Sequence, residues 1–272
     1  MDISTKYNCS EVVEMRISPL TKVVGAVADG VDLRQMSDAL FHEIEAALAE
    51  HLVLYFPDQS FDRFQLRELA RRFGPPFVHP IEKIQFDDCP GVLELRREPN
   101  AKEIFGGGGW HSDFTWNQTS GYISILHGKI VPSVGCDTCF VSSIAAFESL
   151  SLRMQSILRN LRAIHLYHGY DGDINADYTA KHPVVRTHPI TGKEGLFVNS
   201  MFVTQFEGMT VAESRPILEF LYRLLEEHRF SCRFRWQEGG VLMWDNRFTL
   251  HYPINDNRDE LRLMIWASSL ES

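Results

Sequence analysis

The chain has 272 residues, a formal net charge of −9 and a sequence pI near 5.7. This balance supplies no broad basic field, so it argues against a nucleic-acid partner and against an anionic membrane surface. No apolar run approaches the roughly 20 residues that a membrane-spanning helix needs, and no signal-peptide pattern is present, so we expect a cytoplasmic protein. Large β folds of this length commonly form one domain, and we expect a single domain over residues 1–272.

The first part of the chain predicts two amphipathic helices with a buried strand between them. Ser37 and Asp62 are suitable N-cap residues, and each precedes apolar residues at helical spacing. Residues 52–56 form a short apolar run that Pro57 and Asp58 close, a pattern typical of a buried strand.

The remainder of the chain predicts many short strands and a few helices. We expect a helical pair over residues 143–161, interrupted near Leu150 and Ser151, and a helix over 211–228 that begins with the capping-box spacing of Thr210 and Glu213. The predicted strands cover residues 92–96, 122–126, 138–141, 184–187, 196–199, 231–236, 241–244 and 261–268.

These strands do not alternate regularly with helices, which disfavours a doubly wound parallel sheet. The pattern favours a mainly β fold with added helices, built on a double-stranded β-helix, or jelly roll, core. Gly106 to Gly109 predict a loop that lets the backbone approach a ligand, and they lack the pattern of a phosphate-binding loop.

Five cysteines, an odd number, do not indicate a disulfide framework. Cys136 and Cys139 form a Cys-x-x-Cys motif, which can be a redox pair or half of a zinc site. The chain has no second such motif, and residues 138–141 are typical of a strand, so we expect ordinary thiols at both positions.

A His-x-Asp motif at His111 and Asp113, with the distant His251, indicates a metal site. Residues two apart in a strand point to the same face, so the first two side chains can hold one ion. A second histidine completes a set of two imidazoles and one carboxylate, which suits non-haem ferrous iron and leaves coordination positions open. The three residues therefore predict oxygen chemistry.

The chain resembles the taurine/2-oxoglutarate dioxygenase family, which also includes the aryloxyalkanoate dioxygenases. The resemblance is carried by short segments whose order and spacing agree over nearly the whole chain. They are Ser18-Pro19-Leu20, Arg72-Phe73-Gly74, His79-Pro80, Trp110-His111-Ser112-Asp113, Gly135-Cys136-Asp137-Thr138, His182-Pro183-Val184, Trp244-Asp245-Asn246-Arg247 with His251, and Arg262.

The resemblance implies an enzyme that uses Fe(II), 2-oxoglutarate and O2 and releases succinate and CO2. His111, Asp113 and His251 fall on the family's iron ligands, and Thr138 and Arg262 fall on its 2-oxoglutarate-binding positions. A guanidinium suits the far carboxylate of 2-oxoglutarate because it donates two parallel hydrogen bonds.

Asp113 bears on the reaction. Relatives that halogenate have alanine or glycine at this position, so the retained carboxylate favours hydroxylation, desaturation or epoxidation of a small organic substrate.

Three positions depart from the members that act on taurine. Their sulfonate-binding arginine corresponds to Trp266, a tyrosine corresponds to Glu82, and an asparagine falls within Gly106 to Gly109. These differences argue against taurine as the substrate. The residues that we expect near the substrate are His79, Glu82, Trp116, Phe202 and Trp266; the alternative is a structural role for His79 and a core or surface role for the other four.

Four further histidines, His165, His168, His182 and His188, are interpreted as structural. Two other functions use the same residues: a zinc hydrolase, in which the metal activates water, and a non-catalytic jelly-roll binding module. Because relatives commonly form dimers or tetramers, the resemblance also implies a homo-oligomer.

Overall fold

Two facing β-sheets form the centre of the protein in a computed structural model that describes residues 14–79, 85–101, 108–167 and 178–271. The larger sheet has the order β1 (Arg16–Pro19), β2 (Ala26–Asp29), β3 (Val53–Phe56), β14 (Val241–Asp245), β6 (Gly121–Ile130), β16 (Arg262–Leu270), β5 (Cys89–Arg97) and β4 (Gln85–Phe86). The smaller sheet has the order β13 (Ser231–Phe234), β7 (Thr138–Ser142) and β15 (Thr249–Pro253). The expected mainly β fold with a jelly-roll core is confirmed.

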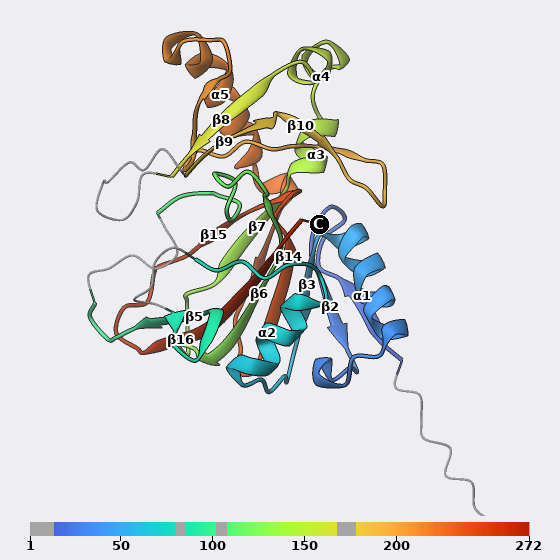
Figure 1. Cartoon of the computed structure of the whole chain (residues 1–272), viewed down its shortest axis with the longest axis vertical. Coiled ribbons are helices and arrows are strands. Elements are labelled where there is room, and N and C mark those ends of the chain that lie inside the picture. Colours follow the sequence, from blue (N-terminus) through green and yellow to red (C-terminus); the bar gives the residue numbers. More distant parts are fainter. Residues whose placement is uncertain (1–13, 80–84, 102–107, 168–177, 272) are drawn as a thin grey trace, which may run out of the picture.

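The remaining strands form two small sheets: β12 (Val203–Phe206) with β8 (Arg162–Leu166) and β9 (Thr179–Pro183), and β10 (Val185–Thr187) with β11 (Glu194–Leu196). The helices are α1 (Asp38–His51), α2 (Arg63–Arg71), α3 (Ser143–Glu148), α4 (Leu152–Leu158) and α5 (Val211–Leu225), with short 3-10 helices at Leu33–Gln35 and His228–Phe230. Figure 1 shows α1 and α2 beside the large sheet, whereas α3 to α5 gather at the other end with β8 to β10.

Alternation of apolar side chains explains why the large sheet is covered on both faces. On β14, Val241 and Met243 pack in the cluster under α1 and α2, whereas Leu242 and Trp244 pack in the cluster between the two sheets. Successive strand residues point to opposite faces, so a continuous apolar run predicts burial on both sides. The second cluster surrounds the site described below.

The predicted helix starts are confirmed by their caps. The side chain of Ser37 accepts a hydrogen bond from the third residue of its helix, and Asp62 forms a capping box with Gln65. Thr210 and Glu213 form the predicted capping box of α5. The predicted helical pair is interrupted where expected, because α3 ends at Glu148 and α4 begins after its own N-cap at Ser151.

The predicted strands differ from the structure mainly at their ends. The strand expected at 196–199 is largely wrong, since β11 ends at Leu196, where pairing with β10 stops. Strands β1, β2, β4, β8, β9, β12 and β15 were not predicted. Most are short, and β9 and β15 each end in a proline, which weakens the strand signal.

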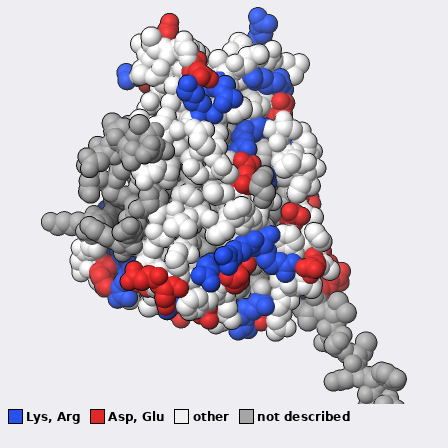
Figure 2. All heavy atoms as spheres, in the orientation of Figure 1, with Lys and Arg blue, Asp and Glu red and all other residues white. Residues whose placement is uncertain are grey.

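In the part of the chain that the structure describes, no helix is both long enough and apolar enough to cross a membrane. The face shown in Figure 2 carries positive and negative side chains side by side, with a largely uncharged area between the charged groups.

Candidate metal centre and its surroundings

The three predicted metal ligands meet between the two central sheets. His251 lies on β15, and His111 pairs with it through two backbone hydrogen bonds of 2.7 and 3.1 Å. The expectation that His111 and Asp113 share a strand is wrong, because only His111 makes a bridge and the chain then turns. Phe114 has a positive φ of 56°, which turns the backbone immediately after Asp113.

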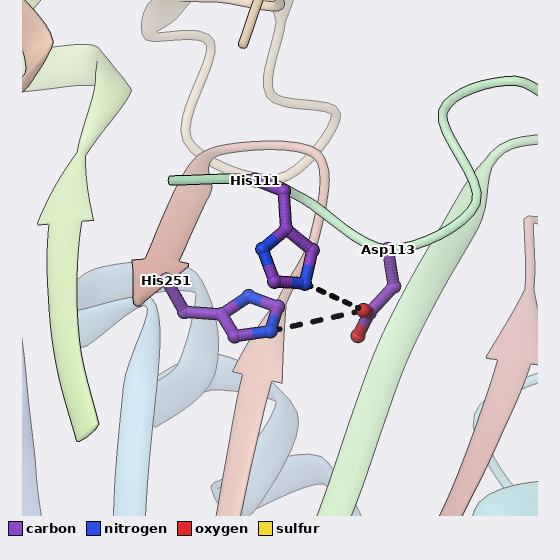
Figure 3. Close-up of side chains that lie close together, drawn as sticks. All are labelled: His111, Asp113 and His251. Carbon is purple, nitrogen blue, oxygen red and sulfur yellow. Dashed lines mark ion pairs between the residues drawn. The ribbon is translucent and has the colours of Figure 1, made fainter. Parts of the chain in front are cut away.

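The ligand atoms nevertheless point at one another (Figure 3). Oδ1 of Asp113 lies 3.8 Å from Nε2 of His111 and 3.7 Å from Nε2 of His251. These distances are too long for hydrogen bonds, but two atoms so spaced can each lie about 2.1 Å from one cation. Among the described residues, this is the one group of three or more potential ligands whose donor atoms converge.

Hydrogen bonds orient two of the ligands. Nδ1 of His111 lies 3.0 Å from the carbonyl oxygen of Gly109, so it donates there and leaves Nε2 with a free lone pair. Oδ2 of Asp113 accepts a hydrogen bond of 2.7 Å from Oγ of Ser124, which leaves Oδ1 for a metal. Nδ1 of His251 is buried and has no hydrogen-bond partner among the described residues.

Asn246 holds the segment that carries Asp113. Its Oδ1 accepts from the backbone N–H of Asp113 at 3.1 Å, and its Nδ2 donates to Oγ of Ser124 at 2.8 Å. Nε1 of Trp244 donates to the same Oδ1 at 2.9 Å. The neighbouring Arg247 instead forms a buried ion pair with Asp245, at 2.6 Å.

Burial sets the charge state of the site without a metal. It raises the pKa of the Asp113 carboxyl, an effect that His111 and the hydrogen bond from Ser124 partly oppose. Burial also lowers the pKa of His251 well below its usual value, and the nearby His111 lowers it further. Both shifts disfavour charge, and a divalent cation would reverse the effect on the carboxyl. Two neutral imidazoles and a carboxylate fit such an ion.

The two residues expected to bind 2-oxoglutarate lie on the inner faces of opposite sheets. Thr138 begins β7, is buried, and accepts a hydrogen bond of 3.0 Å from Nε1 of Trp236. Arg262 begins β16 and is only 1% exposed, and burial lowers its pKa to about 10. Arg262 lies on the same face of β16 as Met264 and Trp266, which pack between the two sheets. Arg97, opposite Arg262 on β5, was missed because strand pairing alone reveals it.

Three of the residues expected near the substrate belong to one aromatic group, which we call the aromatic cluster. It consists of Phe77, Phe114, Trp116, Tyr167, Tyr178, Phe202 and Trp266. The Phe77 and Phe114 rings stack with centroids 3.7 Å apart, and Trp266 lies 5.2 Å from Phe114. Phe202 connects the cluster to the metal centre, since its ring is 6.1 Å from that of His111.

His79 adjoins the aromatic cluster, with its ring 5.9 Å from that of Phe114. Burial lowers the pKa of His79 to about 4, so its imidazole is neutral near pH 7. Glu82, Gly106 and Gly107 lie outside the described residues.

The other candidate ligands are not part of a described metal group. His165 and His182 pack against each other with ring centroids 5.1 Å apart, and His188 contacts Asp245 at 3.7 Å. His168 lies outside the described residues. Cys136 and Cys139 are free thiols.

Two histidines and one carboxylate that converge between two jelly-roll sheets are typical of non-haem metal oxygenases. Comparison with known proteins agrees. The family model "Taurine catabolism dioxygenase TauD, TfdA family" matches residues 16–265. The chain is 29% identical to an alpha-ketoglutarate-dependent sulfate ester dioxygenase of Pseudomonas putida, over 93% of this chain and 88% of the relative. It is 30% identical to an alpha-ketoglutarate-dependent 2,4-dichlorophenoxyacetate dioxygenase of Cupriavidus pinatubonensis, over 89% and 94%.

Solved structures agree with the sequence comparisons. A crystal structure of a taurine dioxygenase from Burkholderia xenovorans superposes with a TM-score of 0.83 at 30% identity, covering 95% of this chain and 90% of that one. The chain therefore belongs to the TauD/TfdA family and is a dioxygenase dependent on 2-oxoglutarate, which is another name for alpha-ketoglutarate.

Proposed function

We propose that His111, Asp113 and His251 bind ferrous iron, and that the enzyme uses it with 2-oxoglutarate and O2 to hydroxylate a small organic molecule. The observation that carries this proposal is the convergence of two Nε2 atoms and one carboxylate oxygen within 4.8 Å of one another. Iron, when bound, would activate O2, which is the oxidant, and the oxidative decarboxylation of 2-oxoglutarate to succinate and CO2 would supply two of the electrons for its reduction.

The protein's own part is to position the reactants and to exclude water. Ser124 and Asn246 hold the Asp113 carboxylate and backbone, so the ligand set is arranged before the metal arrives. Thr138 and Arg262 are proposed to bind the far carboxylate of 2-oxoglutarate, because each presents hydrogen-bond donors in a buried environment that favours an ionic partner.

We further propose that the substrate is uncharged and carries an apolar or aromatic ring. The aromatic cluster next to the metal centre presents ring side chains, and the imidazole of His79 beside it is neutral. Trp266 occupies the position at which relatives acting on taurine have an arginine, so this chain has no guanidinium at that position for a sulfonate. Burial of a ring against these side chains would be favourable without a counter-ion.

Succinate formation tests the proposal directly. Anaerobically prepared protein, loaded with Fe(II) and 2-oxoglutarate, is exposed to O2 with a panel of neutral aryl ethers and phenols and with their carboxylate and sulfate counterparts. We expect neutral members to accelerate succinate formation and Zn(II)-loaded protein to form none.

The outcomes separate the two parts of the proposal. If only the anionic members accelerate the reaction, the substrate class is wrong and the dioxygenase function stands. If iron-loaded protein forms no succinate with or without a panel member, or if the zinc-loaded protein hydrolyses the sulfate esters, the iron function is wrong. A cytoplasmic location and a dimeric or tetrameric state stay predictions, and light scattering tests the second.

A further inference from the structure

Two buried arginines lie directly opposite each other on neighbouring strands. The register of β16 and β5 pairs Arg262 with Arg97 and Trp266 with Leu93. Side chains opposite each other in an antiparallel pair have Cβ atoms about 5 Å apart and point to the same face. Leu93 and Trp266 both belong to the cluster between the two sheets. Arg97 and Arg262 each lie four residues away on the same strand, so their side chains leave the backbone on that same inner face.

Arg97 is buried with unsatisfied donors. It is 3% exposed. Its Nη2 donates to the carbonyl oxygen of Asn257 and approaches Sγ of Cys136 at 3.2 Å. Its Nε and Nη1 are also buried, and they have no hydrogen-bond partner within the described part of the chain. A buried cation with two unused donor groups is costly unless an anion completes its surroundings.

The second arginine increases this cost. Arg262 is itself 1% exposed; burial lowers its pKa and the positive charge of Arg97 lowers it further, whereas Cys136 and Asp137 oppose the shift. Asp137, which follows Cys136 in the chain, accepts a hydrogen bond of 2.6 Å from the exposed Arg233 through Oδ2. No ion pair of Arg97 occurs among the described residues. Two like charges therefore face one region in which an anionic ligand would relieve their repulsion.

We propose that Arg97 joins Arg262 in binding the far carboxylate of 2-oxoglutarate. This inference rests on the proposed function and deepens it by adding a residue that no sequence motif marked. Arg97 supplies a second positive charge and the N–H donors of Nε and Nη1. It thereby favours a 2-oxo acid with a second carboxylate over one with an apolar tail.

A purely structural role for Arg97 is the competing explanation, since its Nη2 holds the Asn257 loop. The two roles differ in what they affect. A residue that only holds the loop changes the binding of every 2-oxo acid alike. A residue that binds the far carboxylate changes the preference between 2-oxoglutarate and 2-oxopentanoate, which has the same chelating end and lacks the second carboxylate.

Calorimetric titration without O2 measures this preference. Mn(II)-loaded wild-type protein and its Arg97→Gln variant are titrated with 2-oxoglutarate and with 2-oxopentanoate. Loss of a charge-assisted interaction predicts that the preference for 2-oxoglutarate falls about 10- to 100-fold in the variant. Arg262→Gln is the positive control. Arg96→Gln is the matched control, because Arg96 is exposed on the same strand and pairs with Glu98.

Arg97→Met provides a second test that does not depend on the first variant folding. The variant lacks a buried charge that is incompletely compensated, so without 2-oxoglutarate we expect it to melt at a temperature at least equal to that of the wild type. When 2-oxoglutarate is added, we expect the melting temperature of the variant to rise less than that of the wild type. The inference is overturned if both 2-oxo acids weaken equally in Arg97→Gln, if the preference is unchanged, or if Arg97→Met melts lower and keeps the full increase. Failure of the wild type to bind 2-oxoglutarate would instead count against the proposed function.

Discussion

At the scale of single residues, Ser124 orients the Asp113 carboxylate, which we propose as a metal ligand. Its hydroxyl donates to Oδ2 of Asp113 at 2.7 Å. We expect Ser124→Ala to lower Mn(II) affinity about 10- to 100-fold, since partners of metal ligands have effects of that order. Titration with Mn(II) measures the affinity. Ser149→Ala is the control, because the Ser149 hydroxyl donates to the carbonyl oxygen of Ala146 in α3. Equal affinity in wild-type and Ser124→Ala protein would contradict this role.

The buried His127 makes the free energy of unfolding depend on pH. Burial lowers its pKa to about 4, with a smaller contribution from Lys129. An unfolded histidine titrates near pH 6.5, so below that pH the unfolded chain binds a proton that the folded protein excludes. The free energy of unfolding therefore falls as the pH drops from about 6.5 to 4, by up to about 1.4 kcal/mol per pH unit for this one group.

Urea unfolding of the metal-free protein at several pH values measures this contribution. We expect His127→Gln to have a shallower dependence than the wild type over the same range. His42→Gln is the control, because His42 is exposed on α1. Parallel curves for the wild type and His127→Gln would show that His127 does not contribute.

Single residues were predicted where a motif marks them. His111, Asp113 and His251 could be found from the His-x-Asp motif, the distant histidine and the resemblance to a known family. Arg97 and Ser124 could not, because an arginine in a charged segment and a serine in an apolar strand are ordinary in sequence. Their importance depends on strand register, which brings each next to a residue far away in the chain.

At the scale of elements, the start of β6 fixes the segment that carries Asp113. A Cβ added at Gly121 would lie 2.9 Å from the carbonyl oxygen of Asp113 and 3.3 Å from the Phe114 ring. Because backbone cannot move away cheaply, we expect Gly121→Ala to shift Asp113 and to weaken Mn(II) binding at least about 10-fold. Gly108→Ala is the matched control, since a Cβ there meets nothing within 4 Å. Unchanged binding in Gly121→Ala would show that the segment adapts.

The elements themselves were predicted unevenly. Helix starts were found because capping side chains act within a few residues, as at Ser37 and Thr210. The predicted strand around His111 was wrong because a positive φ at Phe114 turns the chain, and alternation in sequence does not report backbone angles. Strand β15, which carries His251, is short (Thr249–Pro253). It forms because it pairs with β7, and its composition alone does not predict a strand.

At the scale of the whole molecule, a metal would link a loop to a distant strand. His111 and Asp113 lie before β6, and His251 lies on β15 in the opposite sheet. An ion that binds only the folded state stabilises it by about 2.7 kcal/mol at a concentration 100 times its dissociation constant. We therefore expect Mn(II) to raise the melting temperature and a chelator to reverse the increase, as measured by calorimetry.

His251→Ala separates this effect from nonspecific binding. The variant should lose most of the metal-dependent increase, whereas His228→Ala, at a 3-10 helix outside the central sheets, should keep it. An equal increase in both variants would place the stabilising ion elsewhere.

The position of β16 has a consequence for synthesis. This strand, Arg262–Leu270, lies between β6 and β5 in the large sheet. In the sequence, β6 ends at residue 130 and β5 at residue 97, far before β16 begins. During translation, β5 and β6 are therefore synthesised long before β16, and each has an unpaired edge until β16 is made. Unpaired strand edges are prone to aggregation. We expect ribosome-arrested chains that stop before β16 to be digested quickly by protease and to need a chaperone, and chains in which Leu270 has left the ribosome to be protected. The proposed metal site can consequently be enclosed only when the nascent protein is almost finished.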